Sequence, residues 1–358
     1  MKILHVITSL HTGGAERLMT DLLPRFKRDG LDIDLLVFDG TDTPFKQRLQ
    51  DAGIRIYELS QGGSVYNPLR IFQLLPYIRR YDIIHTHNTA PQLYVALANL
   101  FCHSHLITTE HSTLNRRRNW KWYRFIDKWM YNRYDRVICI SDKTETNLKK
   151  YLTTESQKIC TIYNGIDIKH FTEAKPCLSI KTRSSDIIIM MVAGFRYQKD
   201  QDTVIKSLCY LPTQYQLYLV GDGVRRPECE RLSRQLQVNN RVHFLGIRND
   251  IPELLKASDI VVMSSHLEGF GLAAVEGMAA GKPVIASDVD GLREVVKDAG
   301  ILFSLGDYQQ LAQIIKQLTS DRTEYNRIAH LCINRAKAYD ISAMVMSYEH
   351  IYKDIYKF

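Results

Sequence analysis

Two glutamates, Glu268 and Glu276, lie eight positions apart where a predicted strand, 259–263, turns into a helix of small residues. Open α/β sheets bind their ligands at such turns. Glycines in the turn let the backbone approach a bound group, and the amides at the helix start can donate to it. Either glutamate alone is typical of a solvated surface. Together they favour a ligand that is rich in hydroxyls and carries phosphate, such as a nucleotide sugar.

Cations follow an earlier strand of the same half of the chain. Arg196 and Lys199 come directly after the predicted strand 187–193. Two cations in that loop would neutralise a diphosphate, each charge-assisted hydrogen bond contributing roughly 1.5–3 kcal/mol. Taken alone, they could equally be ordinary surface cations. Ile247 follows the strand 242–245, in a loop whose backbone groups could hold a base. The carboxyl ends of parallel strands share one edge of a sheet, so we expect these loops to converge.

The first half of the chain has a glycine loop and several histidines. Gly13 and Gly14 precede a predicted helix but do not form the Gly-x-Gly-x-x-Gly fingerprint, which disfavours dinucleotide-dependent oxidoreduction. His111 lies just past a strand end, where a packed histidine and a ligand-facing histidine are equally plausible. His85 and His87 alternate within a strand with no third metal ligand in the sequence nearby. We interpret these two as structural or as lining a cleft.

Strands and amphipathic helices alternate along the chain in two successive series, which predicts parallel sheets covered on both faces. The predicted strands are 2–8, 33–38, 54–59, 83–86, 106–109 and 137–140, then 187–193, 216–220, 242–245, 259–263 and 283–286. A polar stretch, 173–186, reads as a linker, and helices are expected near 307–318, 322–338 and 342–357. The fold class is therefore α/β, with two Rossmann-like doubly wound lobes facing across a cleft. We place the first lobe at 1–168, completed by the helix 342–358, and the second at 169–341.

The composition is that of a soluble globular protein, with 45% hydrophobic and 24% charged residues. The apolar stretch at the N-terminus is too brief for a signal peptide, and no uninterrupted apolar run approaches the ~18 residues that span a bilayer. Seven cysteines, an odd number without metal-ligand spacing, favour reduced thiols and a cytoplasmic protein.

One segment, 116–136, carries much of the net charge of +8, with eight Lys and Arg against two Asp, and it contains all three tryptophans. Helical spacing predicts one apolar face, made by Trp122, Phe125, Ile126, Trp129 and Met130. A basic helix with aromatic residues can bind an anionic membrane surface. The same face could instead pack into the first lobe, and both interpretations stay open. Nucleic acid is disfavoured because no known binding motif accompanies the charge.

These motifs, taken in order, resemble those of the retaining glycosyltransferases of family 4, which have the two-lobed GT-B fold. The resemblance runs over nearly the whole chain. It rests on Gly13-Gly14, Glu110-His111-Ser112, Ile140-Ser141, Asn164-Gly165-Ile166-Asp167, Arg196 with Lys199, Gly221-Asp222-Gly223, and Glu268 with Glu276. The family often has Gly-Arg-Leu where this chain has Gly194-Phe195-Arg196, which makes Lys199 the firmer of the two cations.

The resemblance implies a role for each matching position. Arg196 and Lys199 would hold the donor pyrophosphate, which Gly13 and Gly14 would approach from the other lobe. The remaining implied donor-site residues are Asn164, Ile247, Glu276 at the ribose, and Glu268 with Phe270, Gly271 and Leu272 at the sugar. His111 would lie near the reacting centre, so His111 and Glu268 are the catalytic candidates. Neither a metal nor another cofactor is expected.

The implied reaction is retaining transfer of a hexosyl unit from a nucleotide donor, most simply a UDP-sugar. The expected acceptor is a glycan or a polyprenyl-linked precursor of a surface polysaccharide, reached in the cytoplasm or at the cytoplasmic face of the membrane. Two alternatives are a nucleotide-sugar 2-epimerase of the same fold and a non-catalytic subunit that binds a sugar nucleotide. Only a transferase consumes its donor in an acceptor-dependent way.

Overall fold

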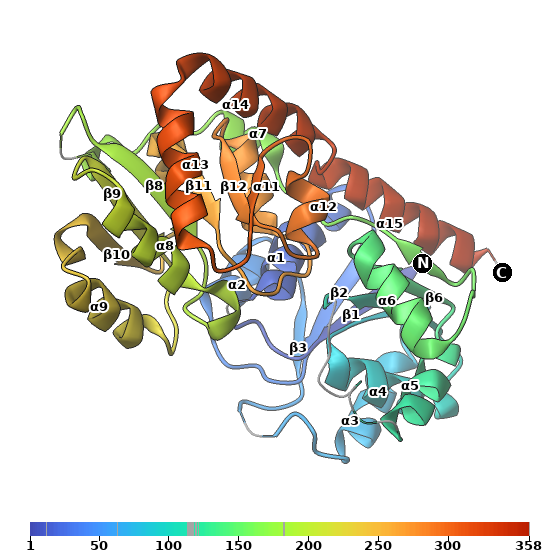
Figure 1. The fold of residues 1–358 in the computed structure, drawn as a ribbon. Helices are drawn as coiled ribbons and strands as arrows, with labels where there is room; N and C mark the ends of the chain where they lie inside the picture. Colours follow the sequence, from blue (N-terminus) through green and yellow to red (C-terminus); the bar gives the residue numbers. More distant parts are fainter. Residues whose placement is uncertain are drawn as a thin grey trace. The chain divides into compact units, whose positions relative to one another are not determined.

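The computed structural model describes residues 1–11, 13–62, 64–112, 118, 120, 122–181 and 183–357 (Figure 1). The chain forms two compact units, one made of Met1–Asn164 with Ile341–Phe358 and the other of Gly165–Asp340. The divisions fall after 164 and after 340, whereas the sequence predicted them after 168 and after 341. The polar stretch 173–186 therefore lies inside the second unit.

The first unit is built on a seven-stranded, all-parallel sheet in the order β3-β2-β1-β4-β5-β6-β7. Its strands are β1 (Lys2–Ile7), β2 (Asp32–Val37), β3 (Ile56–Glu58), β4 (Ile83–His87), β5 (His105–Glu110), β6 (Arg136–Cys139) and β7 (Ile159–Thr161). Six of them were predicted. No strand was predicted at β7, a three-residue strand at the sheet edge.

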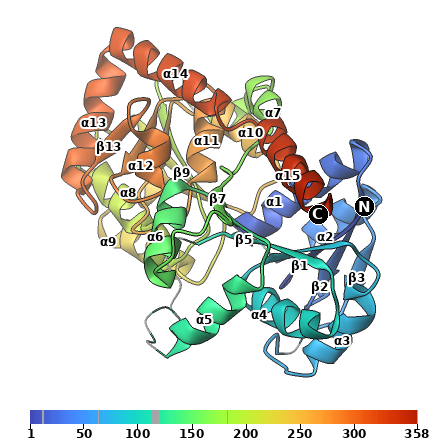
Figure 2. The ribbon, with the colours of Figure 1, turned by 90° about the vertical axis from the view of Figure 1, so that its right-hand side faces the viewer.

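Helices cover both faces of this sheet, because successive residues of each strand point to opposite sides. The helices are α1 (Gly14–Arg28), α2 (Pro44–Asp51), α3 (Arg70–Ile78), α4 (Thr89–Ala98), α5 (Tyr123–Asn132), α6 (Asp142–Leu152) and α15 (Ile341–Tyr356). Apolar residues of α1, α2 and α15 form one core, and those of α3, α4, α5 and α6 form the other. Figure 2 shows α15 running beside α1 on one side of the sheet, with α3, α4 and α5 on the other.

The second unit repeats the plan with six parallel strands in the order β10-β9-β8-β11-β12-β13. Its strands are β8 (Ile187–Val192), β9 (Tyr215–Val220), β10 (Val242–Gly246), β11 (Ile260–Met263), β12 (Val284–Ser287) and β13 (Ile301–Phe303). Its helices are α7 (Ile168–Thr172), α8 (Gln201–Ser207), α9 (Arg226–Gln235), α10 (Ile251–Ala257), α11 (Leu272–Ala279), α12 (Leu292–Val296), α13 (Tyr308–Ser320) and α14 (Arg322–Lys337). Five strands were predicted, and β13 was not.

Both sheets reverse their winding direction beside their first strand. The chain winds outward from β1 through β2 and β3, then returns to lay β4 against the other side of β1. In the second unit β8 and β11 are related in the same way. The connections diverge at these switch points, which is where open α/β sheets bind ligands. The predicted class of two doubly wound, Rossmann-like parallel sheets is confirmed.

No helix in the described ranges combines the length and the apolar character needed to cross a membrane.

Candidate functional site

Lys199 and Glu268 come together at the switch point of the second sheet. Lys199 follows β8, in the 3-10 turn Tyr197–Lys199, and Glu268 follows β11. Because β8 and β11 are neighbours, their loops are adjacent, and Lys199 Nζ forms an ion pair with Glu268 Oε2. The two side chains are 25% and 15% exposed, so a ligand can reach both charges.

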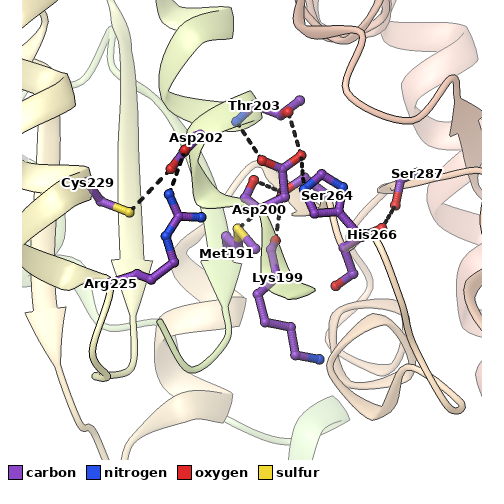
Figure 3. A network of polar contacts seen from close by, with 11 residues as sticks. Met191, Lys199, Asp200, Asp202, Thr203, Arg225, Cys229, Ser264, His266 and Ser287 are labelled. Carbon is purple, nitrogen blue, oxygen red and sulfur yellow. Dashed lines mark hydrogen bonds and ion pairs between the residues drawn. The ribbon is translucent and has the colours of Figure 1, made fainter. Parts of the chain in front are cut away.

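Backbone contacts fasten these two loops to each other (Figure 3). Ser264 Oγ donates to the carbonyl oxygens of Asp200 at 2.7 Å and Lys199 at 3.2 Å. The His266 amide donates to the carbonyl oxygen of Gln198 at 2.8 Å. Figure 3 shows the Lys199 side chain leaving this network. The loops therefore hold the Lys199 backbone in place, and its ammonium group extends out of this network to Glu268.

Asp200 anchors the same turn from its other side. Its φ of +50° lies in the left-handed region, and its carboxylate accepts a hydrogen bond from Thr203 Oγ1 at 2.6 Å. His266 Nε2 lies 3.7 Å from Asp200 Oδ2. Burial raises the pKa of the Asp200 carboxyl, although the hydrogen bonds from Thr203 and the nearby His266 oppose the shift. Asp200 thus caps the helix that follows and sets the conformation of the Lys199 loop.

Arg196 is exposed at the start of this turn, where the chain departs from the family pattern. Phe195 is buried against Phe244, with ring centroids 5.9 Å apart. Gly194 has no side chain, and Arg196 Nε lies 4.0 Å from the position that a Cβ on Gly194 would occupy. The guanidinium stem therefore extends back over Gly194. A cation thus remains at this loop even though the neighbouring positions are glycine and phenylalanine.

The Gly221-Asp222-Gly223 turn supports the cationic loop by close packing. A Cβ on Gly221, at φ +129°, would lie 2.3 Å from the carbonyl oxygen of Ala193. A Cβ on Gly223, at φ +154°, would lie 2.5 Å from the carbonyl oxygen of Phe195. The Phe195 amide donates to the Asp222 carbonyl oxygen at 3.0 Å. This turn, a weak motif in the sequence, needs its glycines so that two loops can touch through their backbones.

Glu276 lies inside helix α11, where it is 1% exposed. Gly271 caps this helix with a φ of +94°, and Leu272 is the first helical residue. Phe270 is 3% exposed and packs edge-on against Tyr339, with ring centroids 5.1 Å apart. Glu268 therefore contributes a reachable carboxylate on the strand-to-helix turn, whereas Glu276 contributes a nearly buried one from the helix that follows the turn.

Ile247 lies in the exposed loop after β10, and its side chain is 67% exposed. Arg226 was not predicted as a site residue, yet it borders this loop. Its Nη1 atom lies 3.6 Å from the position that a Cβ on Gly246 would take, and its guanidinium lies over the Phe244 ring at 6.0 Å. Because Arg226 begins helix α9, which precedes β10 in the chain, no local sequence signal links it to Ile247.

The switch point of the first sheet carries the glycine loop. Gly13 caps α1, and a Cβ there would lie 2.1 Å from Glu16 Oε2. Around Gly14 a Cβ would meet no described atom within 4 Å, so its backbone is open to a ligand. Asn88 follows β4 with a φ of +69° and donates through Nδ2 to Glu16 Oε1 at 3.3 Å. Asn88 and Glu16 were not singled out in the sequence.

His111 lies beside the same edge, after β5, and is hydrogen-bonded to a buried histidine. His87 Nδ1 lies 3.0 Å from His111 Nε2, and His87 Nε2 lies 3.0 Å from His5 Nδ1. Burial lowers the pKa of His111 to about 4. His5 was missed because it belongs to a distant segment, and only the pairing of β1 with β4 brings it beside His85.

His5, His85 and His87 also have nitrogens within 4.8 Å of one another, a grouping that could hold a metal ion. Every ring nitrogen of these residues, however, already has a hydrogen-bond partner. Tyr352 Oη lies 3.3 Å from His5 Nε2 and 2.6 Å from His85 Nδ1, and Thr109 Oγ1 lies 2.8 Å from His85 Nε2. The geometry fits a hydrogen-bonded chain better than a set of free ligands.

Asn164 is the last residue of the first unit and is 5% exposed. Within the described ranges its Oδ1 atom is buried without a hydrogen-bond partner. A buried acceptor of this kind is uncommon in folded proteins.

Two family models match the chain. The model described as Glycosyltransferase Family 4 matches residues 12–170, and the one described as Glycosyl transferases group 1 matches residues 179–338. The chain is a GT-B glycosyltransferase of the family 4 type. The glycosyltransferase is 24% identical to the UDP-Gal:alpha-D-GlcNAc-diphosphoundecaprenol alpha-1,3-galactosyltransferase of Escherichia coli, over 99% of this chain and 97% of that protein.

A second relative and one solved structure agree with this assignment. The N,N'-diacetylbacillosaminyl-diphospho-undecaprenol alpha-1,3-N-acetylgalactosaminyltransferase of Campylobacter jejuni is 28% identical over 62% of the glycosyltransferase and 55% of the relative. The crystal structure of HepE of Anabaena in complex with UDP-glucose superposes with a TM-score of 0.87, covering 99% of this chain and all of that one at 24% identity. The GT-B fold is thereby confirmed.

The basic segment of the glycosyltransferase differs from its predicted arrangement. Helix α5 turns Met130 and Tyr131 into the core, where Tyr131 Oη donates to the buried Glu110 carboxylate at 2.5 Å. Trp122 and Phe125 are instead 61% and 80% exposed. The single apolar face predicted for Trp122, Phe125, Ile126, Trp129 and Met130 is therefore wrong, because the polar contact of Tyr131 sets the rotation of the helix.

The cations of this segment are also not equivalent. Arg118 Nη2 lies 3.1 Å from Glu110 Oε2, and both side chains are at most 9% exposed, so Arg118 is not a solvated surface cation. Arg133 lies over the Trp129 ring at 5.3 Å. Arg116, Arg117 and Lys121 lie outside the described residues. What remains exposed is an aromatic group, Trp120, Trp122 and Phe125, on a segment rich in positive charge.

Proposed function

We propose that this glycosyltransferase moves a hexosyl unit from a UDP-sugar to a glycan or polyprenyl-linked acceptor, with retention of anomeric configuration, in surface polysaccharide synthesis. The observation that carries the proposal is the ion pair of Lys199 with Glu268 at the second switch point. A cation suits a diphosphate and a carboxylate suits sugar hydroxyls. The names of the E. coli and C. jejuni relatives, which include diphosphoundecaprenol-type acceptors, and the UDP-glucose bound to HepE support the choice of substrates.

The donor would displace the Lys199–Glu268 contact. Lys199, with Arg196, would turn to the pyrophosphate, and Glu268 would accept hydrogen bonds from the hexose. Backbone groups of Phe270, Gly271 and Leu272 would hold the same sugar, and Glu276 would take the ribose hydroxyls. The base would rest at the loop of Ile247. Gly13, Gly14 and the side-chain amide of Asn164 are the remaining proposed donor contacts.

Catalysis would consist of positioning and charge stabilisation. The leaving diphosphate develops negative charge, which fixed cations and helix-start amides stabilise most strongly when they are preorganised. We propose that the diphosphate accepts the proton of the attacking hydroxyl and that no protein nucleophile is used. We further propose that no metal takes part, since Lys199 and Arg196 would neutralise the phosphates. All seven cysteines are free thiols, in keeping with the cytoplasmic site of action that we propose.

Donor consumption, followed by release of UDP from a panel of UDP-sugars, tests the function. We expect turnover only when a lipid-linked glycan acceptor is present and expect it to persist in EDTA. Sugar release or isomerisation without acceptor would indicate the 2-epimerase alternative. Donor binding without turnover under any condition would indicate a non-catalytic subunit.

The two glutamates should respond differently to substitution. Glu276→Ala should weaken UDP binding by about tenfold or more, because a carboxylate that accepts ribose hydroxyls is lost. Glu268→Ala should leave UDP affinity equal or tighter, since Lys199 is released to the phosphates, yet lower kcat by about a hundredfold. Calorimetry and initial rates measure the two effects, with Glu228→Ala as a matched exposed control. Unchanged UDP affinity in Glu276→Ala would refute the ribose assignment.

We also propose that the exposed aromatic group on the basic segment binds an anionic bilayer. Trp120 and Trp122 are stacked, with ring centroids 6.1 Å apart, and Phe125 is exposed one turn into α5. Indole rings favour the headgroup region, and nearby cations such as Lys128 and Arg133 attract anionic lipid. Such binding would bring the enzyme to a polyprenyl-linked acceptor.

Vesicle flotation tests the membrane contact. The wild-type protein should float with phosphatidylglycerol vesicles but not with phosphatidylcholine alone. Replacing Trp122 and Phe125 by serine should lower the partition coefficient at least about tenfold, because two apolar side chains no longer insert. Serine at Leu178 and Met346, two exposed apolar residues elsewhere, is the control. Equal flotation of both double variants would contradict the proposal.

A further inference from the structure

A buried hydrogen-bonded chain leads from His111 to the C-terminal helix α15. It passes through His87, His5, Tyr352, His85 and Thr109 to Tyr348, with successive separations of 3.0, 3.0, 3.3, 2.6, 2.8 and 3.2 Å. The histidines other than His111 are fully buried, as are Thr109 and both tyrosines. The chain therefore has one accessible end, at His111, and one enclosed end, at Tyr348.

Each group in the chain is neutral at physiological pH. Burial lowers the pKa of His5 to about 3 and that of His111 to about 4, and it lowers the pKa values of His85 and His87 well below the ordinary range. Burial also raises the pKa of Tyr352 well above its usual value. A neutral imidazole carries one hydrogen and offers one acceptor nitrogen, so every histidine here donates once and accepts once.

A count of hydrogens then fixes the direction of the chain. Four neutral imidazoles and three hydroxyls carry seven hydrogens, whereas the seven groups are joined by six links. One hydrogen must therefore point out of the chain, either at one of its ends or at an internal hydroxyl that accepts hydrogen bonds from both of its neighbours. Among the described residues, the hydroxyls of Tyr348, Thr109 and Tyr352 have no hydrogen-bond partner outside the chain, so an outward hydrogen on any of them would be buried and unsatisfied. Buried donors without acceptors are strongly disfavoured.

The outward hydrogen consequently belongs at His111, whose Nε2 is used by the chain and whose Nδ1 is not. Tyr348 donates to Thr109, Thr109 to His85, His85 to Tyr352, Tyr352 to His5, His5 to His87 and His87 to His111. In this direction each histidine carries its hydrogen on Nδ1. In the opposite direction each would carry it on Nε2, and His111 would present a bare nitrogen lone pair.

We propose that this chain fixes all four histidines as Nδ1–H tautomers and so makes His111 a neutral hydrogen-bond donor to an oxygen of the bound ligand. His87 and His5 act as positioning residues, because they impose this state without meeting the ligand. The identity of the oxygen, a hydroxyl or phosphate oxygen of the nucleotide sugar, rests on the proposed function. A donor at this place binds a developing negative charge or a sugar hydroxyl, and it cannot serve as a general base.

The tautomers can be read directly by long-range ¹H–¹⁵N correlation spectra of the ligand-free, ¹⁵N-histidine-labelled protein. His5, His85, His87 and His111 are assigned from single substitutions. We expect all four to show the Nδ1–H pattern at neutral pH. Nε2–H patterns at His87 and His111 would overturn the proposal, and so would a protonated imidazolium or loss of the pattern on treatment with a chelator, which would indicate a bound metal.

Substitution at His87 tests the effect on His111. His87→Leu removes the donor to His111 Nε2, so we expect His111 to lose the Nδ1–H tautomer and kcat to fall about tenfold, with UDP affinity changed less than about twofold. His87→Asn places an amide N–H near the former Nδ1 position and should restore the tautomer and most of kcat. Equal losses in both variants would show a packing role only.

Tyr348→Phe is the matched control within the chain. It removes one hydrogen and one link together, so the direction and the tautomers should not change. If the wild-type protein transfers no sugar under any condition, the proposed function fails while the tautomer spectra still decide the present proposal.

Discussion

The ion pair of Lys199 with Glu268 is the contact on which the proposed donor site depends. Two loops that the parallel sheet makes adjacent place these opposite charges together, and Ser264 holds the loops to each other through backbone carbonyl groups. The charges are thereby preorganised and mutually compensated before a ligand arrives. A ligand must replace both halves of this contact at once. A nucleotide diphosphate joined to a sugar would do so under the function proposed here, because it would bring phosphate to the cation and hydroxyls to the carboxylate.

The two units supply different chemistry. The second unit offers fixed charges, Lys199, Arg196 and Glu268, at its switch point. The first offers open backbone at Gly14 and a histidine, His111, held neutral by burial. If His111 meets the donor as proposed, a neutral hydrogen-bond donor could stabilise a ligand oxygen without adding another positive charge. A buried layer of polar side chains in the first sheet holds His111 through hydrogen bonds, whereas most buried layers of such a sheet are apolar.

Much of the fold could be predicted because long apolar strands and amphipathic helices alternate with little ambiguity. The short edge strands β7 and β13 were not predicted, whereas β3, which is equally short, lies within a longer apolar stretch and was predicted. Lys199 and Glu268 were predicted to lie close because both follow parallel strands, a rule that works without knowing the strand order. The contact of His5 with His87 was not predicted, because it spans 82 positions and depends on β1 and β4 being neighbours. The prediction of the buried face of α5 was wrong for a similar reason, because Tyr131 forms a hydrogen bond with Glu110 that the apolar pattern does not reveal.

Hydrogen exchange measured by mass spectrometry with and without UDP tests the position of the donor site most directly. If the nucleotide binds at the second switch point, exchange should slow in peptides that contain residues 194–199, 246–248 and 269–276, while peptides from β12 and β13 should exchange as before. Protection that is absent from all three segments, at UDP concentrations that raise the melting temperature, would contradict the account.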